Sequence, residues 1–265
     1  MSALLFEKTG HIVTLTINRP ESRNPLGEDG DGELFAEAAG RINADRDVRC
    51  AILTGAGKAF SAGGNLKAMR ERAGSFAGPG IHIRERYRTG IHRMVRAIWG
   101  IDVPVIAAIN GPAIGLGNDV ACLADLRIAA ESAIFGATFL KVGLVPGDGG
   151  AWILPRTIGM ARAAELFFTG DTIDAATALQ WGLVSRVVPG EMLLAEAHAL
   201  AARICRQPPD VLRMTKRLMR EGQGASFDTI MEMSAAFQSL AHLTYDHGEA
   251  VAAFFDKRES EFKGL

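Results

Sequence analysis

The chain has little cysteine and no cysteine motif. Its three cysteines, Cys50, Cys122 and Cys205, are scattered through 265 residues without C-x-x-C spacing. Their number is odd, and each stands in an apolar or helical context, so a disulfide framework is not expected. We interpret all three as reduced, buried thiols.

The chain also lacks an excess of charge of either sign. Lysine and arginine number 29 against 30 aspartates and glutamates, and the formal net charge is −1. Without a basic field, nucleic acid and anionic membrane surfaces are not expected as main partners. An anionic ligand would have to be held by local groups.

Long hydrophobic runs are absent as well. The amino terminus has no basic segment followed by an apolar stretch, and no segment reaches the roughly eighteen apolar residues that a membrane span requires. The composition, 48% hydrophobic and 22% charged, is typical of a soluble globular protein with a large core. We therefore expect a cytoplasmic protein that does not bind membranes.

Several familiar catalytic motifs are missing. The segment 53–59 resembles a phosphate-binding loop but ends in Ala59, where that loop has serine or threonine. Gly115-Leu116-Gly117 is followed by Val120, where a dinucleotide fingerprint needs glycine or alanine. The six histidines form no H-E-x-x-H pattern, and no serine lies in a G-x-S-x-G elbow. No metal site and no permanently bound cofactor are predicted.

The elements that are present predict an α/β protein with a helical tail. Strand-like runs alternate with helical or glycine-rich segments as far as Pro189. Helical spacing then dominates, and a succession of apolar helical stripes favours oligomerisation. The predicted strands are 13–17, 50–53, 103–109, 126–129 and 183–188, and the predicted tail helices are 191–205, 209–220 and 226–245.

Two glycine-containing turns dominate the sequence. They are the segments 60–67, F-S-A-G-G-N-L-K, and 110–119, N-G-P-A-I-G-L-G-N-D. Each follows an apolar run rich in strand formers and leads into helical spacing, which predicts backbone N–H groups aimed outward at a helix start. Two such donors converging on one oxygen would form an oxyanion hole. A thioester carbonyl bound there could be converted to an enolate.

These turns carry a family resemblance. Together with the segments 104–111, 143–150, 168–171 and 181–188, they resemble the signature segments of the crotonase superfamily, the enoyl-CoA hydratase/isomerase family. The match runs from Ile12 to the C-terminus in the family's order. It implies a crotonase (ClpP-like) spiral of ββα units at residues 1–195, which holds the active site, and a C-terminal helical region at residues 196–265. That region would form a homotrimer or a dimer of trimers.

The resemblance also implies a site. Family members bind acyl-CoA esters, with coenzyme A as part of the substrate, and the two thioester donors map onto the N–H groups of Ala62 and Leu116. Leu116 replaces a glycine of well-known hydratases, which would be harmful if the position needed a positive φ. Further substrate or coenzyme A contacts map onto Ser61, Gly64, Asn65, Lys67, Gly115, Phe139, Phe254 and Lys257. The last two would reach a neighbouring subunit.

The expected acid–base pair is incomplete. Hydratases use two glutamates, and the first maps onto Asp119 while the second maps onto Phe139, which cannot accept a proton. Asp148, between two glycines of the 143–150 segment, is the substitute candidate, since apolar neighbours would raise its pKa. Two structural alternatives stay open: Asp148 as a turn-forming residue, and Asp119 as the charge at a helix N-terminus.

The expected reaction is hydration of a 2-enoyl-CoA. Double-bond isomerisation is the alternative, because one base can remove and return a proton. A catalytically silent acyl-CoA-binding protein is the other alternative, which Phe139 favours. Residues 70–90 are expected to shape the acyl end of the site.

Overall fold

A central sheet organises the molecule. The computed structural model describes residues 2–264. Six strands lie in the order β1-β2-β3-β4-β6-β9, with β1 and β2 antiparallel and every other neighbouring pair parallel. Their bounds are Leu4–Thr9 (β1), Ile12–Ile17 (β2), Cys50–Gly55 (β3), Val105–Ile109 (β4), Leu126–Ala130 (β6) and Arg186–Val188 (β9).

A second, smaller sheet contains a short strand that lies within the second glycine turn. In it β5 pairs in parallel with β7, and β7 pairs with β8 in antiparallel fashion. The bounds are Ala113–Ile114 (β5), Ile134–Gly136 (β7) and Thr172–Asp174 (β8). A single bridge between Ser61 and Ala113 connects the first glycine turn to this sheet.

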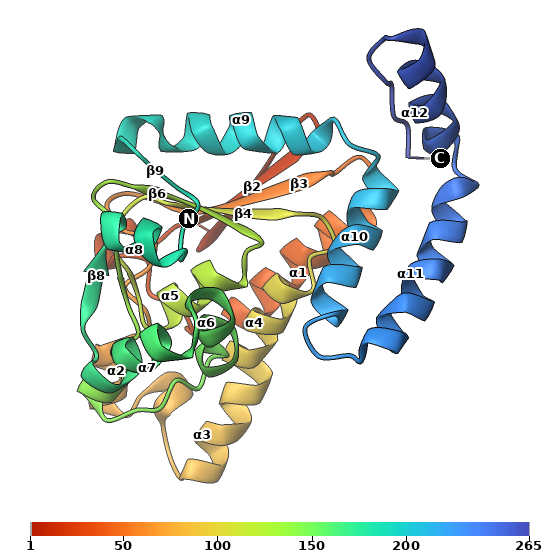
Figure 1. Ribbon diagram of the computed structural model, residues 1–265. Coiled ribbons are helices and arrows are strands. Elements are labelled where there is room, and N and C mark those ends of the chain that lie inside the picture. The colour runs from red at the N-terminus through yellow and green to blue at the C-terminus, as the bar shows by residue number, and fades with distance from the viewer. Residues whose placement is uncertain (1, 265) are drawn as a thin grey trace.

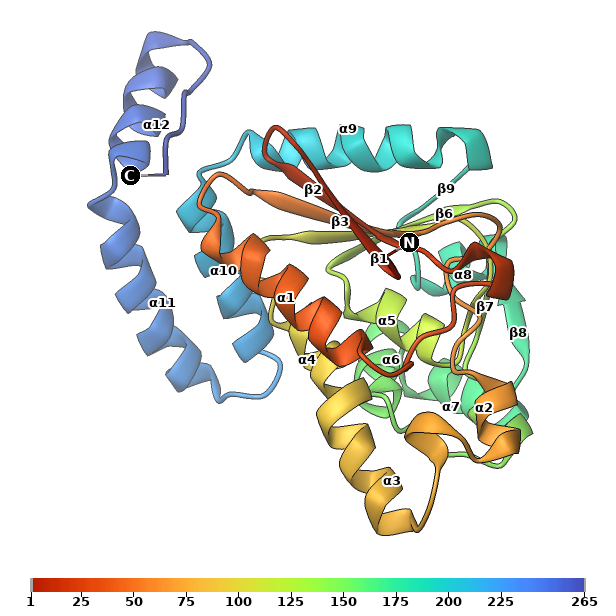
Figure 2. The same cartoon turned by 180° about the vertical axis from the view of Figure 1, so that it is seen from behind.

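Helices cover both faces of the large sheet (Figures 1 and 2). On one face α9 buries Leu193, Ala197 and Ala201 against a cluster of strand side chains. The other face carries the main core and the remaining helices of the body. The helices are Asp31–Ala44 (α1), Leu66–Glu71 (α2), Gly80–Arg86 (α3), His92–Trp99 (α4), Leu116–Leu123 (α5), Gly150–Ile158 (α6), Met160–Thr169 (α7), Ala175–Trp181 (α8), Leu193–Cys205 (α9), Pro209–Glu221 (α10), Phe227–His242 (α11) and Tyr245–Asp256 (α12).

The predicted α/β class and the order of its elements are correct. One predicted helix, in the C-terminal tail, is too long. The tail helix predicted over 226–245 ends at His242, and α12 begins at Tyr245. Thr244 causes the break, because its side chain accepts a hydrogen bond from the His247 N–H and so caps a new helix. No helix among residues 2–264 is long and apolar enough to cross a membrane.

The C-terminal helices do not form one uniform region. The predicted boundary after residue 195 falls within α9, which packs on the sheet. α10 is also fixed to the body, since the buried Lys216 ammonium pairs with Asp125 at 2.6 Å and donates to the Val103 carbonyl at 2.7 Å. Only α11 and α12, of the helices in residues 2–264, extend away from the body as an arm (Figures 1 and 2).

Candidate active site

A small cavity of about 100 Å³ lies between the two glycine turns. Backbone and side chains of both turns form one wall, α2 forms a second, and the helical segment around Tyr87 forms a third. The segment 138–148 closes the site. The lining residues are Ala62, Gly63, Gly64, Leu66, Met69, Phe76, Tyr87, Ile91, Ile114, Gly115, Leu116, Thr138, Phe139, Val142, Leu144 and Asp148.

In the first turn, the N–H group of Gly64 is free and lies on the cavity wall. The N–H of Ala62 donates to the Arg23 carbonyl at 2.9 Å, and the N–H of Gly63 donates to Ser61 Oγ at 3.2 Å. Gly64 N–H has no acceptor among residues 2–264. The predicted donor Ala62 is therefore engaged elsewhere, and Gly64 replaces it as the candidate. Ala62 remains on the cavity wall.

The second turn presents the N–H of Leu116. Gly115 adopts φ 54° and ψ −121°, a conformation that residues with a Cβ rarely take, and its own N–H donates to the Gly136 carbonyl at 2.8 Å. Leu116 is the first residue of α5 and is not among the non-glycine residues with positive φ. The leucine is tolerated because Gly115 takes the strained conformation. Leu116 N–H, at the helix N-terminus, has no acceptor among the described residues.

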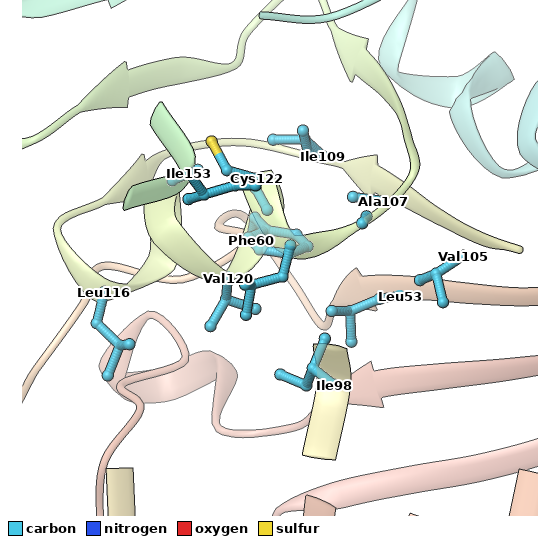
Figure 3. Close-up of a cluster of buried hydrophobic side chains, with 14 of the residues drawn as sticks. Leu53, Phe60, Ile98, Val105, Ala107, Ile109, Leu116, Val120, Cys122 and Ile153 are labelled. Carbon is cyan, nitrogen blue, oxygen red and sulfur yellow. The ribbon is translucent and has the colours of Figure 1, made fainter. Parts of the chain in front are cut away.

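The two turns are held together by backbone contacts. Ile114 N–H donates to the Ser61 carbonyl at 3.0 Å, and Ser61 N–H donates to the Pro112 carbonyl at 3.1 Å. Phe60, the first residue of the first turn, shares a buried cluster with Val120 of α5 (Figure 3). This packing fixes both free N–H groups on the wall of one cavity, which is the preorganisation that an oxyanion hole requires.

Asp119 lies behind the cavity wall and is 1% exposed. Its Oδ2 accepts a hydrogen bond from the Gly150 N–H, at the start of α6, at 3.0 Å. It thus stabilises the N-terminus of α6, and it also lies in the first turn of its own helix, α5, where the structural alternative placed it. Burial, and then the charge of Asp148, raise the pKa of Asp119 well above its ordinary value. The second oxygen, Oδ1, is buried without a partner among the described residues.

Asp148 lines the cavity directly. It is 5% exposed, and its Oδ1 is buried without a hydrogen-bond partner among residues 2–264. Burial raises its pKa to about 6. A carboxyl group with this pKa is partly ionised near neutral pH and can take up and return a proton. The unpartnered oxygen gives no support to the alternative that Asp148 serves to form the turn.

Apolar and phenolic side chains complete the acyl end. Phe139 is buried on the cavity wall, where its ring lies near Gly115. Tyr87 begins a short π-helical segment, Tyr87–Ile91, between α3 and α4. Burial, and then the charge of Asp148, raise the pKa of Tyr87 to about 12, so its hydroxyl stays protonated at neutral pH. His92 Nε2 donates to the Gly147 carbonyl at 2.9 Å and anchors the loop that carries Asp148.

The remaining predicted site residues lie outside the cavity wall. Ser61 is fully buried and joins the two turns, and Asn65 caps α2 by accepting from the Ala68 N–H at 3.0 Å. Lys67 is exposed on α2. Phe254, which is 80% exposed, and Lys257 lie at the end of α12, far from the cavity of the same chain (Figures 1 and 2). No cluster of metal-ligating side chains occurs in residues 2–264.

Sequence reasoning missed three contributors to this site. Gly64 was assigned a substrate contact rather than a donor role, while Tyr87 and His92 were not assigned to the site at all. Tyr87 lies within residues 70–90, the segment expected to shape the acyl end. The contact of His92 with Gly147 joins distant parts of the chain, so no local pattern indicates it.

The chain matches a family model along nearly its whole length. The model is described as enoyl-CoA hydratase/isomerase, and it covers residues 7–265. A 1,2-epoxyphenylacetyl-CoA isomerase of Escherichia coli is 36% identical over 253 residues, which cover 96% of this chain and 95% of the relative. A crotonyl-CoA hydratase of Syntrophomonas wolfei is 36% identical over 260 residues, which cover 98% and 97% of the two chains.

Solved structures agree with these relatives. The crystal structure of an enoyl-CoA hydratase from Bacillus anthracis superimposes with a TM-score of 0.92 at 33% identity and covers all of both chains. The resemblance seen in the signature segments, and the crotonase fold that it implied, are thereby confirmed. The chain belongs to the enoyl-CoA hydratase/isomerase family of the crotonase superfamily.

Proposed function

We propose that the protein is an enoyl-CoA hydratase in which Gly64 and Leu116 hold the thioester oxygen and Asp148 transfers the proton. One observation carries this assignment: two N–H groups without an acceptor among residues 2–264 and one carboxyl group with a pKa of about 6 line the same cavity. The N–H pair stabilises negative charge on the thioester oxygen as an enolate forms. Relatives named as enoyl-CoA hydratases support the same reaction class.

Hydration needs one proton acceptor that later acts as a donor. The Asp148 carboxylate takes a proton from a water molecule as its oxygen bonds to Cβ of the 2-enoyl thioester. The electrons of the double bond move to the thioester oxygen, which the two N–H groups hold as an enolate. Protonated Asp148 then returns its proton to Cα, and a 3-hydroxyacyl-CoA is formed.

Double-bond isomerisation is the second candidate. It needs one base only, and of Asp148 and Asp119 one alone lines the cavity. Asp148 lines the cavity, whereas Asp119 does not and Phe139 cannot accept a proton. With a 3-enoyl-CoA, Asp148 would remove a proton from Cα and return it to Cγ, with the dienolate held by the same N–H pair. The Escherichia coli relative is named as an isomerase, which supports this alternative.

Two substrates distinguish the reactions. The purified protein is incubated with crotonyl-CoA and, separately, with a 3-enoyl-CoA, while the absorbance of the conjugated thioester is followed. Loss of absorbance with crotonyl-CoA is the expected result and indicates hydration, and a gain with the 3-enoyl-CoA indicates isomerisation. No change with either substrate, together with measurable binding of both, would overturn the catalytic assignment and favour an acyl-CoA-binding protein.

We also infer that the α11–α12 arm forms the homo-oligomer, a trimer or a dimer of trimers. Leu243, Phe254 and Phe255 are each at least 76% exposed on this arm. Such apolar surface is expected to be covered by another subunit. Phe254 and Lys257 would then reach the coenzyme A of a neighbouring subunit beside Lys67. Sedimentation equilibrium measures the mass of the oligomer and so tests the trimer. We further propose that no cofactor is permanently bound and that the enzyme is cytoplasmic.

A further inference from the structure

A second cleft of about 520 Å³ lies beside the active-site cavity. One wall is the helical segment from α3 to α4, and the other is the loop that leads to Asp148. Tyr87 and four basic side chains line the first wall: Arg84, Arg88, His92 and Arg96. No acidic side chain is among the residues that line this cleft.

The four basic residues recur at intervals of four positions. Residues four apart lie near one another on a helix surface, so the repeat places a row of three guanidinium groups and the His92 ring along the cleft. Arg88 pairs with Glu85 at 3.2 Å. Arg84 and Arg96 have no carboxylate partner among residues 2–264, which leaves two guanidinium groups available to a ligand.

The cleft continues the active-site cavity at its acyl end. Tyr87 and Leu144 line both spaces. Gly147 lies on the wall of the cleft, and its neighbour Asp148 lies on the wall of the cavity. Because the thioester is held at Gly64 and Leu116, an acyl chain that passes Asp148 next meets Tyr87, Leu144 and the cationic row.

The cleft is the larger of the two spaces. Its volume is about 520 Å³ and that of the cavity is about 100 Å³, so the far end of a longer acyl group has room in the cleft. There the side chains of Leu144 and Val145 are apolar, and the facing row is cationic.

We propose that the cleft binds a carboxylate at the far end of the acyl group, so that the preferred substrates are mono-thioesters of short unsaturated dicarboxylic acids with coenzyme A. Arginine is suited to this role because its planar guanidinium group binds a carboxylate through two parallel hydrogen bonds. A methyl terminus offers Arg84 and Arg96 no acceptor. The inference rests on the proposed function for the direction of the acyl chain.

Binding of unreactive thioesters tests the inference without relying on turnover. Glutaryl-CoA and pentanoyl-CoA have acyl groups of equal carbon number, and neither carries a double bond to hydrate. Calorimetry should give a dissociation constant at least about tenfold lower for glutaryl-CoA. The double variant Arg84→Gln/Arg96→Gln should lose this preference and keep the wild-type affinity for pentanoyl-CoA. The matched control, Arg93→Gln, removes a helix arginine that pairs with Glu33 outside the cleft and should keep the preference.

Two results would overturn the inference. Equal affinity of the wild-type protein for both thioesters is one. An equal loss of affinity for both thioesters in the double variant is the other, because the arginines would then bind the phosphates of coenzyme A.

Hydration of pent-2-enoyl-CoA and of its dicarboxylic counterpart is measured in parallel. Binding preference without turnover contradicts the proposed function alone, and turnover without preference contradicts this inference alone.

Discussion

The Asp119 carboxylate accepts its hydrogen bond from the Gly150 N–H at 3.0 Å, and the two residues are in such close contact that a Cβ atom at position 150 would force one of them to move. A Cβ atom at Gly150 would lie 2.3 Å from both Asp119 oxygens. Gly150 begins α6, and the loop just before it carries Asp148. The contact between Asp119 and Gly150 therefore helps to fix the position of Asp148 on the cavity wall.

Substitution of Gly150 by alanine tests this contact. The added methyl group must displace the Asp119 carboxylate or the start of α6, so the free energy of unfolding should fall by about 3 kcal/mol, the upper range for overpacked cores. Urea denaturation measures the change. Gly40→Ala is the control, since Gly40 lies in α1 with open space around it, and that change should stabilise by about 0.5–1 kcal/mol. Equal effects of the two variants would contradict the tight contact.

The two aspartates should differ in their effect on turnover. Asp148→Asn removes the proton carrier from the cavity wall and should lower kcat at least about a hundredfold. Asp119→Asn keeps an oxygen that can accept from the Gly150 N–H, so it should lower kcat less than about tenfold. Steady-state kinetics with the better of the two test substrates compares them. A larger loss in the Asp119 variant would exchange the two assignments.

The pKa of Asp148 predicts the pH dependence of catalysis. Hydration begins with the ionised carboxylate, so kcat/KM should rise with pH through an apparent pKa of about 6 and level off above it. Burial is the cause of this raised value. The rate profile of the free enzyme between pH 4.5 and 8 measures it, and Asp148→Glu should shift the acid limb. An acid limb near pH 4 would mean that the carboxylate is solvated.

The same group should lower stability as the pH rises. The folded pKa of about 6 exceeds the ordinary value of 3.8, so the folded state binds more protons between these values. Stability from Asp148 is fully present below about pH 4 and is lost as the pH rises through 6. The difference of about two pKa units corresponds to about 3 kcal/mol. Asp148→Asn should therefore gain about that much stability relative to wild type between pH 4 and pH 7, measured by urea unfolding. A constant difference would show that Asp148 is not desolvated.

Local patterns explain which parts of this structure the sequence predicts. Each of the apolar runs that form β2, β3, β4 and β6 is a single local stretch of sequence, and so is each glycine turn. Composition and spacing therefore reveal them. The assignment of the donor N–H was wrong because the acceptor for Ala62 is the Arg23 carbonyl, on a distant turn with a positive φ. Tertiary contacts of this kind decide which backbone groups remain free.

The same reason applies to the two acids. The family resemblance indicated a catalytic Asp119 in the second turn, but Asp119 bonds to Gly150, 31 residues away, and is not among the residues that line the cavity. The raised pKa of Asp148 depends on burial by side chains from separate helices. Position alone could not distinguish these two environments, although it identified both residues as candidates.

Removal of a single backbone donor tests the revised oxyanion hole. Gly64→Pro deletes the N–H that we assign to the thioester oxygen, and loss of one such donor typically lowers kcat by about a hundredfold to a thousandfold. Gly64→Ala keeps the N–H, and its methyl group meets only the flexible end of Met69, so its kcat should fall less than about tenfold. Circular dichroism and thermal unfolding show whether the proline variant is folded. A folded proline variant with the kcat of the alanine variant would exclude Gly64, and the oxygen would then depend on Leu116 and another donor.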